Sequence, residues 1–152
     1  MLGDRAKQGL GSGVLAASAT AGTLVGFGIV RGAPVHVLNT IAHTIFGARA
    51  LTAREFDLPV TVTGIAVHYL TLIIYGVVFA ILFGRLRGRQ LMLSAAAVTG
   101  IVAVFDLLIL PPLLRPGFES VLGTGELATI FLELAVALAV GTRIFAPRSV
   151  VA

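Results

Sequence analysis

Four ionisable side chains lie inside long apolar stretches of this sequence: His68, Asp106, Glu126 and Glu133. A charge at the centre of a bilayer costs about 2.5 to 3.5 kcal/mol on the insertion scale, so such groups usually face a bundle interior or a cavity. Burial disfavours the charged form of a carboxyl group, so we expect Glu133 to rest protonated unless a cation is nearby. A carboxyl group that exchanges a proton is what a relay requires.

The two glutamates lie in the stretch GTGELATIFLELAVALAV and are seven residues apart. On a helix this spacing returns nearly to the same face and separates the two residues by about 10 Å. Thr129 lies between them, at spacings of three and four residues. The spacing therefore predicts one polar stripe along the last apolar helix.

A polar pattern also occurs between the first two apolar stretches, in PVHVLNTIAHTIFGARAL. Pro34 is a favourable first helical residue. Apolar residues from Val35 to Ile45 share one helical face, and the other face carries His36, Asn39, Thr40 and His43. We expect a short amphipathic helix over residues 34–47, at the membrane surface or dipping into it. His36, Asn39 and His43 would then cover one end of a bundle.

Structural and metal-binding roles compete with proton transfer. Buried acids can hydrogen-bond to neighbours and hold helices in register, and Thr71, Tyr75 and Thr99 are available. For His68 alone we favour that structural role. A divalent cation held by His68, Asp106 and Glu126 is a further alternative.

The sequence argues against cofactors, an enzyme and nucleic-acid binding. The sequence has no Glu-x-x-His pair for a di-iron site. Haem commonly needs two axial ligands, and only one histidine lies within the predicted spans, so we expect no cofactor. There is no cysteine and no Gly-x-Ser-x-Gly, so we expect no enzyme. The net charge of +4 comes from bases beside apolar stretches, which membrane topology explains better than nucleic acid does.

Composition indicates the environment that positions these groups. Of 152 residues, 57% are hydrophobic and 12% are charged, where soluble domains have about 25% charged residues. The mean hydropathy is +1.03. We expect an integral membrane protein in the lipid bilayer, folded as one all-α domain over residues 1–152. Its four-helix bundle has spans near residues 9–30, 60–83, 91–110 and 121–142.

Small residues recur four apart in the first span, which allows close helix packing in lipid. One row consists of Gly13, Ala17 and Ala21, and a second of Ser18, Gly22 and Gly26. We expect this helix in the middle of the bundle. A signal peptide cleaved near Ala19 is the alternative, but the apolar run continues well beyond that residue.

The distribution of basic residues predicts the orientation. With both termini inside, seven bases lie inside and four outside. The inside set is Arg5, Lys7, Arg85, Arg87, Arg89, Arg143 and Arg148, and the outside set is Arg31, Arg49, Arg54 and Arg115. We expect a bacterial inner-membrane protein with cytoplasmic termini. His68, Asp106 and Glu126 then occupy the outer half of the membrane, with Glu133 near the midplane.

Residues from about Val67 to Pro112 carry a family resemblance. The stretches VHYLTLIIYGVVFAILFGRLRG and LMLSAAAVTGIVAVFDLLILPP join a histidine-bearing span, a short basic loop and a proline-terminated span. This arrangement resembles the YagU-like group of small bacterial inner-membrane proteins. The resemblance covers about a third of the chain, carries over His68 and Pro111, and implies a link to acid tolerance.

The sequence leads to two hypotheses about function. In the first, His68, Asp106, Glu126 and Glu133 line an outward-facing cavity that binds or relays a cation, above all a proton. In the second, the protein is a non-catalytic accessory or scaffold subunit whose glycine-rich first helix docks on a larger membrane complex. A homo-oligomer is compatible with the first hypothesis.

Overall fold

The computed structural model describes residues 2–147. Four long helices are apolar enough to cross a membrane, so the described chain is a multi-pass, all-α membrane protein, as predicted. The spans are α1 (Leu2–Val30), α5 (Leu58–Phe83), α6 (Gly88–Val104) continued by the π-helical turn η1 (Phe105–Ile109), and α7 (Thr124–Ile144). Arg148, counted in the orientation, lies outside the described residues.

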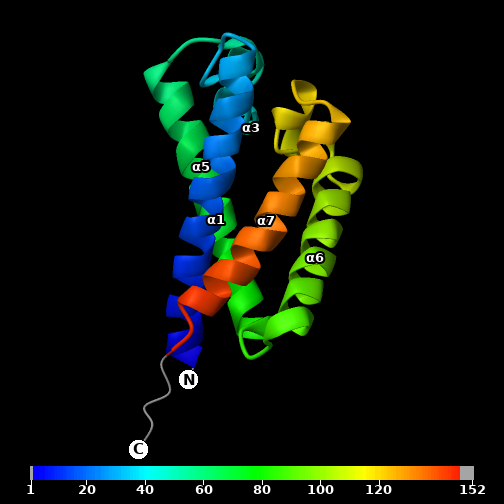
Figure 1. Cartoon of the computed structure of the whole chain (residues 1–152). Coiled ribbons are helices and arrows are strands. Elements are labelled where there is room, and N and C mark those ends of the chain that lie inside the picture. Colours follow the sequence, from blue (N-terminus) through cyan, green and yellow to red (C-terminus); the bar gives the residue numbers. More distant parts are fainter. Residues whose placement is uncertain (1, 148–152) are drawn as a thin grey trace, which may run out of the picture.

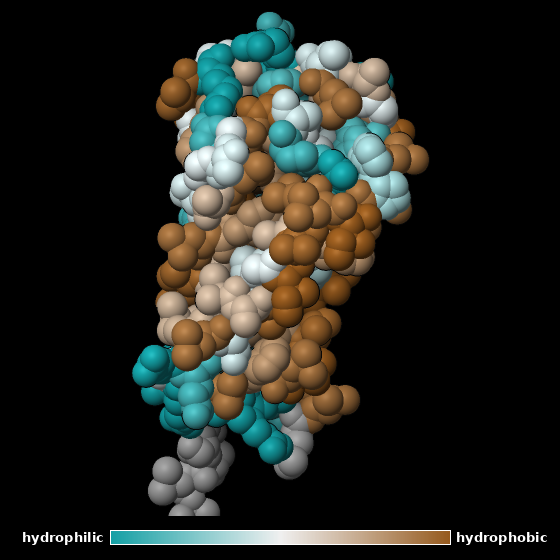
Figure 2. All heavy atoms as spheres, turned by 90° about the vertical axis from the view of Figure 1, so that its right-hand side faces the viewer, coloured by the Kyte–Doolittle hydropathy of each residue, from teal (hydrophilic) through white to brown (hydrophobic). Residues whose placement is uncertain are grey.

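Hydrophilic residues gather at both ends of the bundle and an apolar band lies between them (Figure 2). One end holds the α5–α6 turn with Arg85, Arg87 and Arg89, and we call it the arginine end. α1 begins and α7 ends at this same end (Figure 1). The opposite end, which we call the cap end, consists of residues 31–57 and 110–123.

The central helix is α1, which packs along both α5 and α7, as predicted (Figure 1). Glycine permits the closest approach: a methyl group on Gly13 would lie 2.5 Å from the Cα of Ile73, and one on Gly76 equally close to the backbone of Gly13. Ala17 is fully buried beside this contact. In the second predicted row, Ser18 contacts α5, with its hydroxyl 3.1 Å from that of Tyr69. Gly22 and Gly26 are not at an interface, because a methyl group on either would meet no neighbouring atom within 4 Å.

Two short helices, α2 (His36–Thr40) and α3 (His43–Phe46), replace the single amphipathic helix predicted over residues 34–47, and a third, α4 (Ala48–Thr52), follows them. The chain turns at Gly47, which has a φ of +55°. Every residue from His36 to His43 is buried, so this stretch has no water-facing side. Its polar side chains bond to other parts of the cap end instead, which explains why a surface helix does not form.

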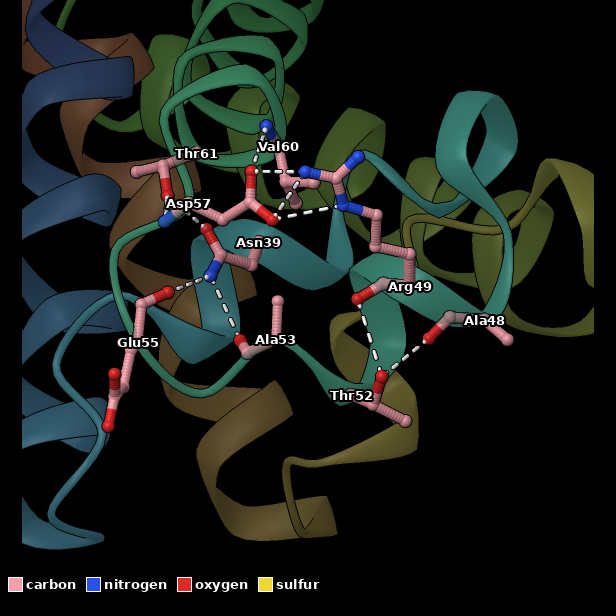
Figure 3. A network of polar contacts seen from close by, with 9 residues as sticks. All are labelled: Asn39, Ala48, Arg49, Thr52, Ala53, Glu55, Asp57, Val60 and Thr61. Carbon is pink, nitrogen blue, oxygen red and sulfur yellow. Dashed lines mark hydrogen bonds and ion pairs between the residues drawn. The ribbon is translucent and has the colours of Figure 1, made fainter.

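Asn39 is the centre of that bonding, at 0% exposure (Figure 3). Its Nδ2 donates to the carbonyls of Ala53 at 2.9 Å and Glu55 at 3.0 Å, and its Oδ1 accepts from the Thr61 hydroxyl at 2.7 Å. The amide therefore ties α2 to the start of α5. Because the Asn39 side chain is itself fully buried and uses both its donor and its acceptor atoms, the contact fixes the cap end firmly.

Asp57 starts α5 beside this network (Figure 3). Its Oδ1 accepts from the backbone N–H of Val60, which is the bond of an N-cap. Arg49 donates from Nε at 3.0 Å and from Nη2 at 2.8 Å to the same carboxylate oxygen. This exposed pair links α4 to the first turn of α5.

The cap end closes over the bundle through two 3₁₀ turns, η2 (Pro112–Leu114) and η3 (Phe118–Ser120). Gly117 joins them with a φ of +89°, a conformation that favours glycine. A side chain there would also overlap the carbonyl of Thr40. The 112–120 segment is thereby held directly against α2 and α3.

Candidate functional site

A cavity of about 250 Å³ opens below the cap end. Its walls come from α1, α5, α6 with η1, and α7, and its roof from α3 and the 110–118 segment. The polar or ionisable side chains that line it are Thr20, Thr44, His68, Thr71, Tyr75, Asp106 and Arg115. Of the four predicted site residues, His68 and Asp106 line this cavity, and Tyr75 lines it as well.

Asp106 reaches this cavity from a π-helical turn. The backbone N–H of Leu110 donates to the carbonyl of Phe105 at 2.9 Å, a bond over five residues rather than four. Pro111 and Pro112 have no N–H with which to continue a helix, and the wider turn ends α6 before them. Single π-turns inside α-helices occur frequently at functional sites. The sequence predicts the stop at the prolines but not the wider turn.

The Tyr75 hydroxyl lies close enough to the Asp106 carboxyl group to interact with it. Asp106 makes no ion pair with any residue in the described part of the chain. Arg115 also lines the cavity, and its Nε donates to the Leu110 carbonyl at 3.0 Å. Glu119 is within electrostatic range of Asp106. Asp106 is thus a half-buried acid without a paired cation.

His68 is buried between α5 and α1. Its Nε2 lies 3.1 Å from the carbonyl oxygen of Ala17 and 3.0 Å from the hydroxyl of Thr20. Because a carbonyl only accepts, Nε2 carries the hydrogen, and the neutral ring then has its acceptor at Nδ1. His68 therefore holds α1 and α5 in register, the structural role, while its ring lines the cavity.

Glu126 is not in the cavity, contrary to the prediction. It forms an ion pair with Arg31 at 2.5 Å, and the same carboxylate oxygen accepts from the backbone N–H of Gly123. Glu126 thus caps the first turn of α7 and joins it to the residue that follows α1. The hydrogen bond from Arg31 to this carboxylate raises the pKa of Arg31 above its ordinary value.

Glu133 does not line the cavity either. α7 presents Ile130, Phe131 and Leu134 to it. Glu133 has one buried carboxyl oxygen, Oε2, without a hydrogen-bond partner among the described residues. The spacing of seven residues indicates that the two glutamates share a face, but it does not tell which face points to the cavity.

The predicted cover is made by different residues of the same segment. His36 Nδ1 lies 2.9 Å from the Ala53 carbonyl, and His43 Nε2 lies 3.3 Å from the carbonyl of Pro112. Neither histidine lines the cavity, nor does Asn39, whereas Ile41 and Thr44 do. The three predicted residues therefore hold the roof in place from outside the cavity.

No group of three or more His, Asp or Glu side chains that could hold a metal ion occurs within residues 2–147. The alternative of a divalent cation held by His68, Asp106 and Glu126 is therefore wrong, because Glu126 bonds to Arg31 instead.

The sequence pattern indicates Tyr75 as a hydrogen-bonding neighbour of the buried acids, and the structure shows that it also lines the cavity. The signal was available, since His68, Thr71 and Tyr75 follow each other at spacings of three and four, which places them on one face of a helix. Arg115 reaches the cavity from an irregular segment, and no periodicity could have indicated it.

Comparisons of the chain with protein-family models, curated proteins and solved structures give no match. The resemblance to the YagU-like group therefore stays a prediction, and the functional argument depends on the geometry of the cavity.

Proposed function

We propose that the protein takes up a cation, in the first place a proton, at an intramembrane site centred on Asp106. The observation that carries this proposal is the position of Asp106 in a cavity with Tyr75 and His68 and without an ion-pair partner among residues 2–147. A carboxylate in this environment is expensive unless a proton or another cation neutralises it.

Asp106 belongs to η1, the last turn of its span before the cap-end segment 110–123, and it lines the cavity with Tyr75 beside it. We therefore propose that the acid exchanges its proton with a source at the cap end. The cytoplasm is proposed to lie at the arginine end, by the positive-inside rule, so that the cavity responds to the outer side of a bacterial inner membrane.

Uptake at this site is proposed without conduction across the membrane. Buried polar side chains continue from the cavity along α1, from Thr20 to Ser12 and Gln8. Thr20 and Ser12 are eight residues apart, which is about 12 Å along a helix. Ala16 and Ala17 fill the intervening turns and are both 0% exposed. Close packing there opposes a chain of waters, so a proton that reaches His68 and Thr20 stops there.

Chemical labelling tests the proposal. Dicyclohexylcarbodiimide, an apolar reagent, adds to protonated carboxyl groups and forms a stable acylurea that mass spectrometry locates. We expect labelling of Asp106 that falls as the pH is raised, and no labelling of Glu126, whose carboxylate is paired with Arg31. Labelling of Glu133 in place of Asp106, or labelling of Asp106 that does not change with pH, would contradict the proposal.

A further inference from the structure

A second hollow adjoins the cavity on the side of the arginine end. It has a volume of about 280 Å³ and lies between α5, α6 and α7. Tyr75, Val102 and Leu134 line both spaces. The other residues of the second hollow are all aliphatic or phenylalanine: Ile74, Val78, Phe79, Leu82, Phe83, Val98 and Leu138. We call it the apolar groove.

The groove exists because α6 packs on α7 and hardly touches α5 (Figure 1). Ile74, Val78 and Leu82 recur at four-residue spacing along the exposed side of α5 and form one wall. From Tyr75 to Leu82 the groove runs about 10 Å along the helix. The cavity that holds Asp106 thus adjoins the apolar groove, and the two spaces share the side chains of Tyr75, Val102 and Leu134. We call the first space the chamber.

The chamber itself combines one acid with aromatic rings. Phe105, Phe118, Phe131 and Tyr75 line it together with Asp106. Aromatic faces attract cations, most strongly where water is excluded. The charged side chains that line the chamber are Asp106 and Arg115, and Glu119, outside the lining, is within electrostatic range of Asp106. With all three ionised, the formal charge near Asp106 is −2 + 1 = −1. The charge and the lining therefore complement one monovalent cation with apolar substituents.

We infer that the cavity and the apolar groove together bind a single-chain lipophilic cation, with its quaternary or protonated amine beside Asp106 and its hydrocarbon tail along α5 as far as Leu82. This inference rests on the proposed function, because the amine takes the place of the proton at the same carboxyl group. The two cations therefore compete, and acidification displaces the amphiphile.

The charged and titratable groups that face Asp106 agree with this competition. α5 contributes Tyr75 and His68, and the 110–120 segment contributes Arg115 and Glu119. α7 contributes only apolar side chains to the chamber. Arg115 is anchored to the Leu110 carbonyl through Nε, which limits its approach to the carboxylate.

The absence of tryptophan from the chain makes a clean test possible. Leu82→Trp places one fluorophore at the far end of the apolar groove. Leu93→Trp places one on α6, at a similarly exposed site outside the groove, 56% against 66% exposed. The probe is an alkyltrimethylammonium ion brominated at the tail end, and its neutral counterpart carries a tert-butyl group in place of trimethylammonium. Both are added to lipid nanodiscs at the same low mole fraction.

We expect the cationic probe to quench Leu82→Trp more than the neutral probe does, by at least about threefold. Both should quench Leu93→Trp equally. Adding Asp106→Asn to Leu82→Trp should remove the preference, whereas adding Glu126→Gln should leave it, because Glu126 lies outside both spaces. Lowering the pH should weaken quenching by the cation alone.

Equal quenching of Leu82→Trp by the two probes, or a preference that survives Asp106→Asn, would overturn the inference. The proposed function fails separately, when carbodiimide labelling of Asp106 shows no pH dependence. If Asp106 is labelled with the expected pH dependence but the probes quench alike, the proton site stands and the lipophilic cation is excluded.

Discussion

Replacing Gly13 with leucine should separate α1 from α5 and lower the free energy of unfolding by about 4 kcal/mol or more, an exceptional effect for one substitution. The added Cβ alone would lie 2.5 Å from the Cα of Ile73 and 2.6 Å from the carbonyl oxygen of Leu72. Because both obstacles are backbone atoms of a helix, no side-chain rotation relieves the overlap, and the two helices must move apart.

Gly22→Leu is the matched control, since it makes the same change on the same helix. A Cβ at Gly22 meets no neighbouring atom within 4 Å, and leucine has the higher helix propensity. We expect unchanged or slightly raised stability. Circular dichroism during denaturation in lipid or mild detergent measures both variants. Equal stability of the two would show that the glycine contact does not hold the bundle together.

The second large effect is expected at the cap end, where Asn39→Ala should cost about 3 kcal/mol of stability. The substitution removes hydrogen bonds to the carbonyls of Ala53 and Glu55 and to the hydroxyl of Thr61. Asn39 is 0% exposed, so water does not replace these bonds without opening the segment. Hydrogen exchange of residues 36–61 should rise well before the long helices are affected.

Thr52→Val provides the comparison for Asn39→Ala within the same segment. Thr52 is exposed and its hydroxyl bonds to the carbonyls of its own helix at Ala48 and Arg49 (Figure 3). A change within about 0.5 kcal/mol is expected there. If Asn39→Ala were as mild as Thr52→Val, the amide would not be the centre of the cap end.

The sequence was sufficient for the architecture because apolar length is a strong signal in a membrane protein. The four spans were predicted, and so was the central place of α1, from small residues such as Gly13 and Ala17. The sequence nevertheless could not show which of the two rows of small residues contacts another helix. The spacing shows only that small residues share one face of α1, not that another helix packs on that face. Gly22 and Gly26 illustrate this limit.

The site was only partly predictable, for a related reason. Periodicity groups residues of one helix, but the cavity is formed by residues from several helices, and the tilt and rotation of each helix decide which faces meet. Glu126 and Arg31 are 95 residues apart in sequence, and no local pattern indicates that they pair. The π-turn at Asp106 adds one residue to the last turn of the span, and the regular 3.6-residue repeat of a helix does not predict where such a turn forms.

At the cap end, the prediction of an amphipathic surface helix was wrong. Alternation of polar and apolar residues from Val35 to Ile45 is typical of a helix at a water boundary. Here the polar side chains bond to backbone carbonyl groups of the cap end instead, as Asn39 and His36 do at Ala53. A polar helix face indicates that its side chains have hydrogen-bond partners, but the sequence does not show whether those partners are water molecules or backbone carbonyl groups.

Infrared difference spectroscopy in lipid shows directly whether Asp106 exchanges a proton in the cavity. Wild type, Asp106→Asn and Glu133→Gln are titrated in parallel while the carboxylic-acid band is followed. An exposed aspartate is ionised above about pH 5. If Asp106 is the proton site, we expect a protonated-carboxyl band that persists above this pH, titrates reversibly, disappears in Asp106→Asn and remains in Glu133→Gln. A titrating band that survives Asp106→Asn, or one that only Glu133→Gln removes, would show that Asp106 is not the proton site.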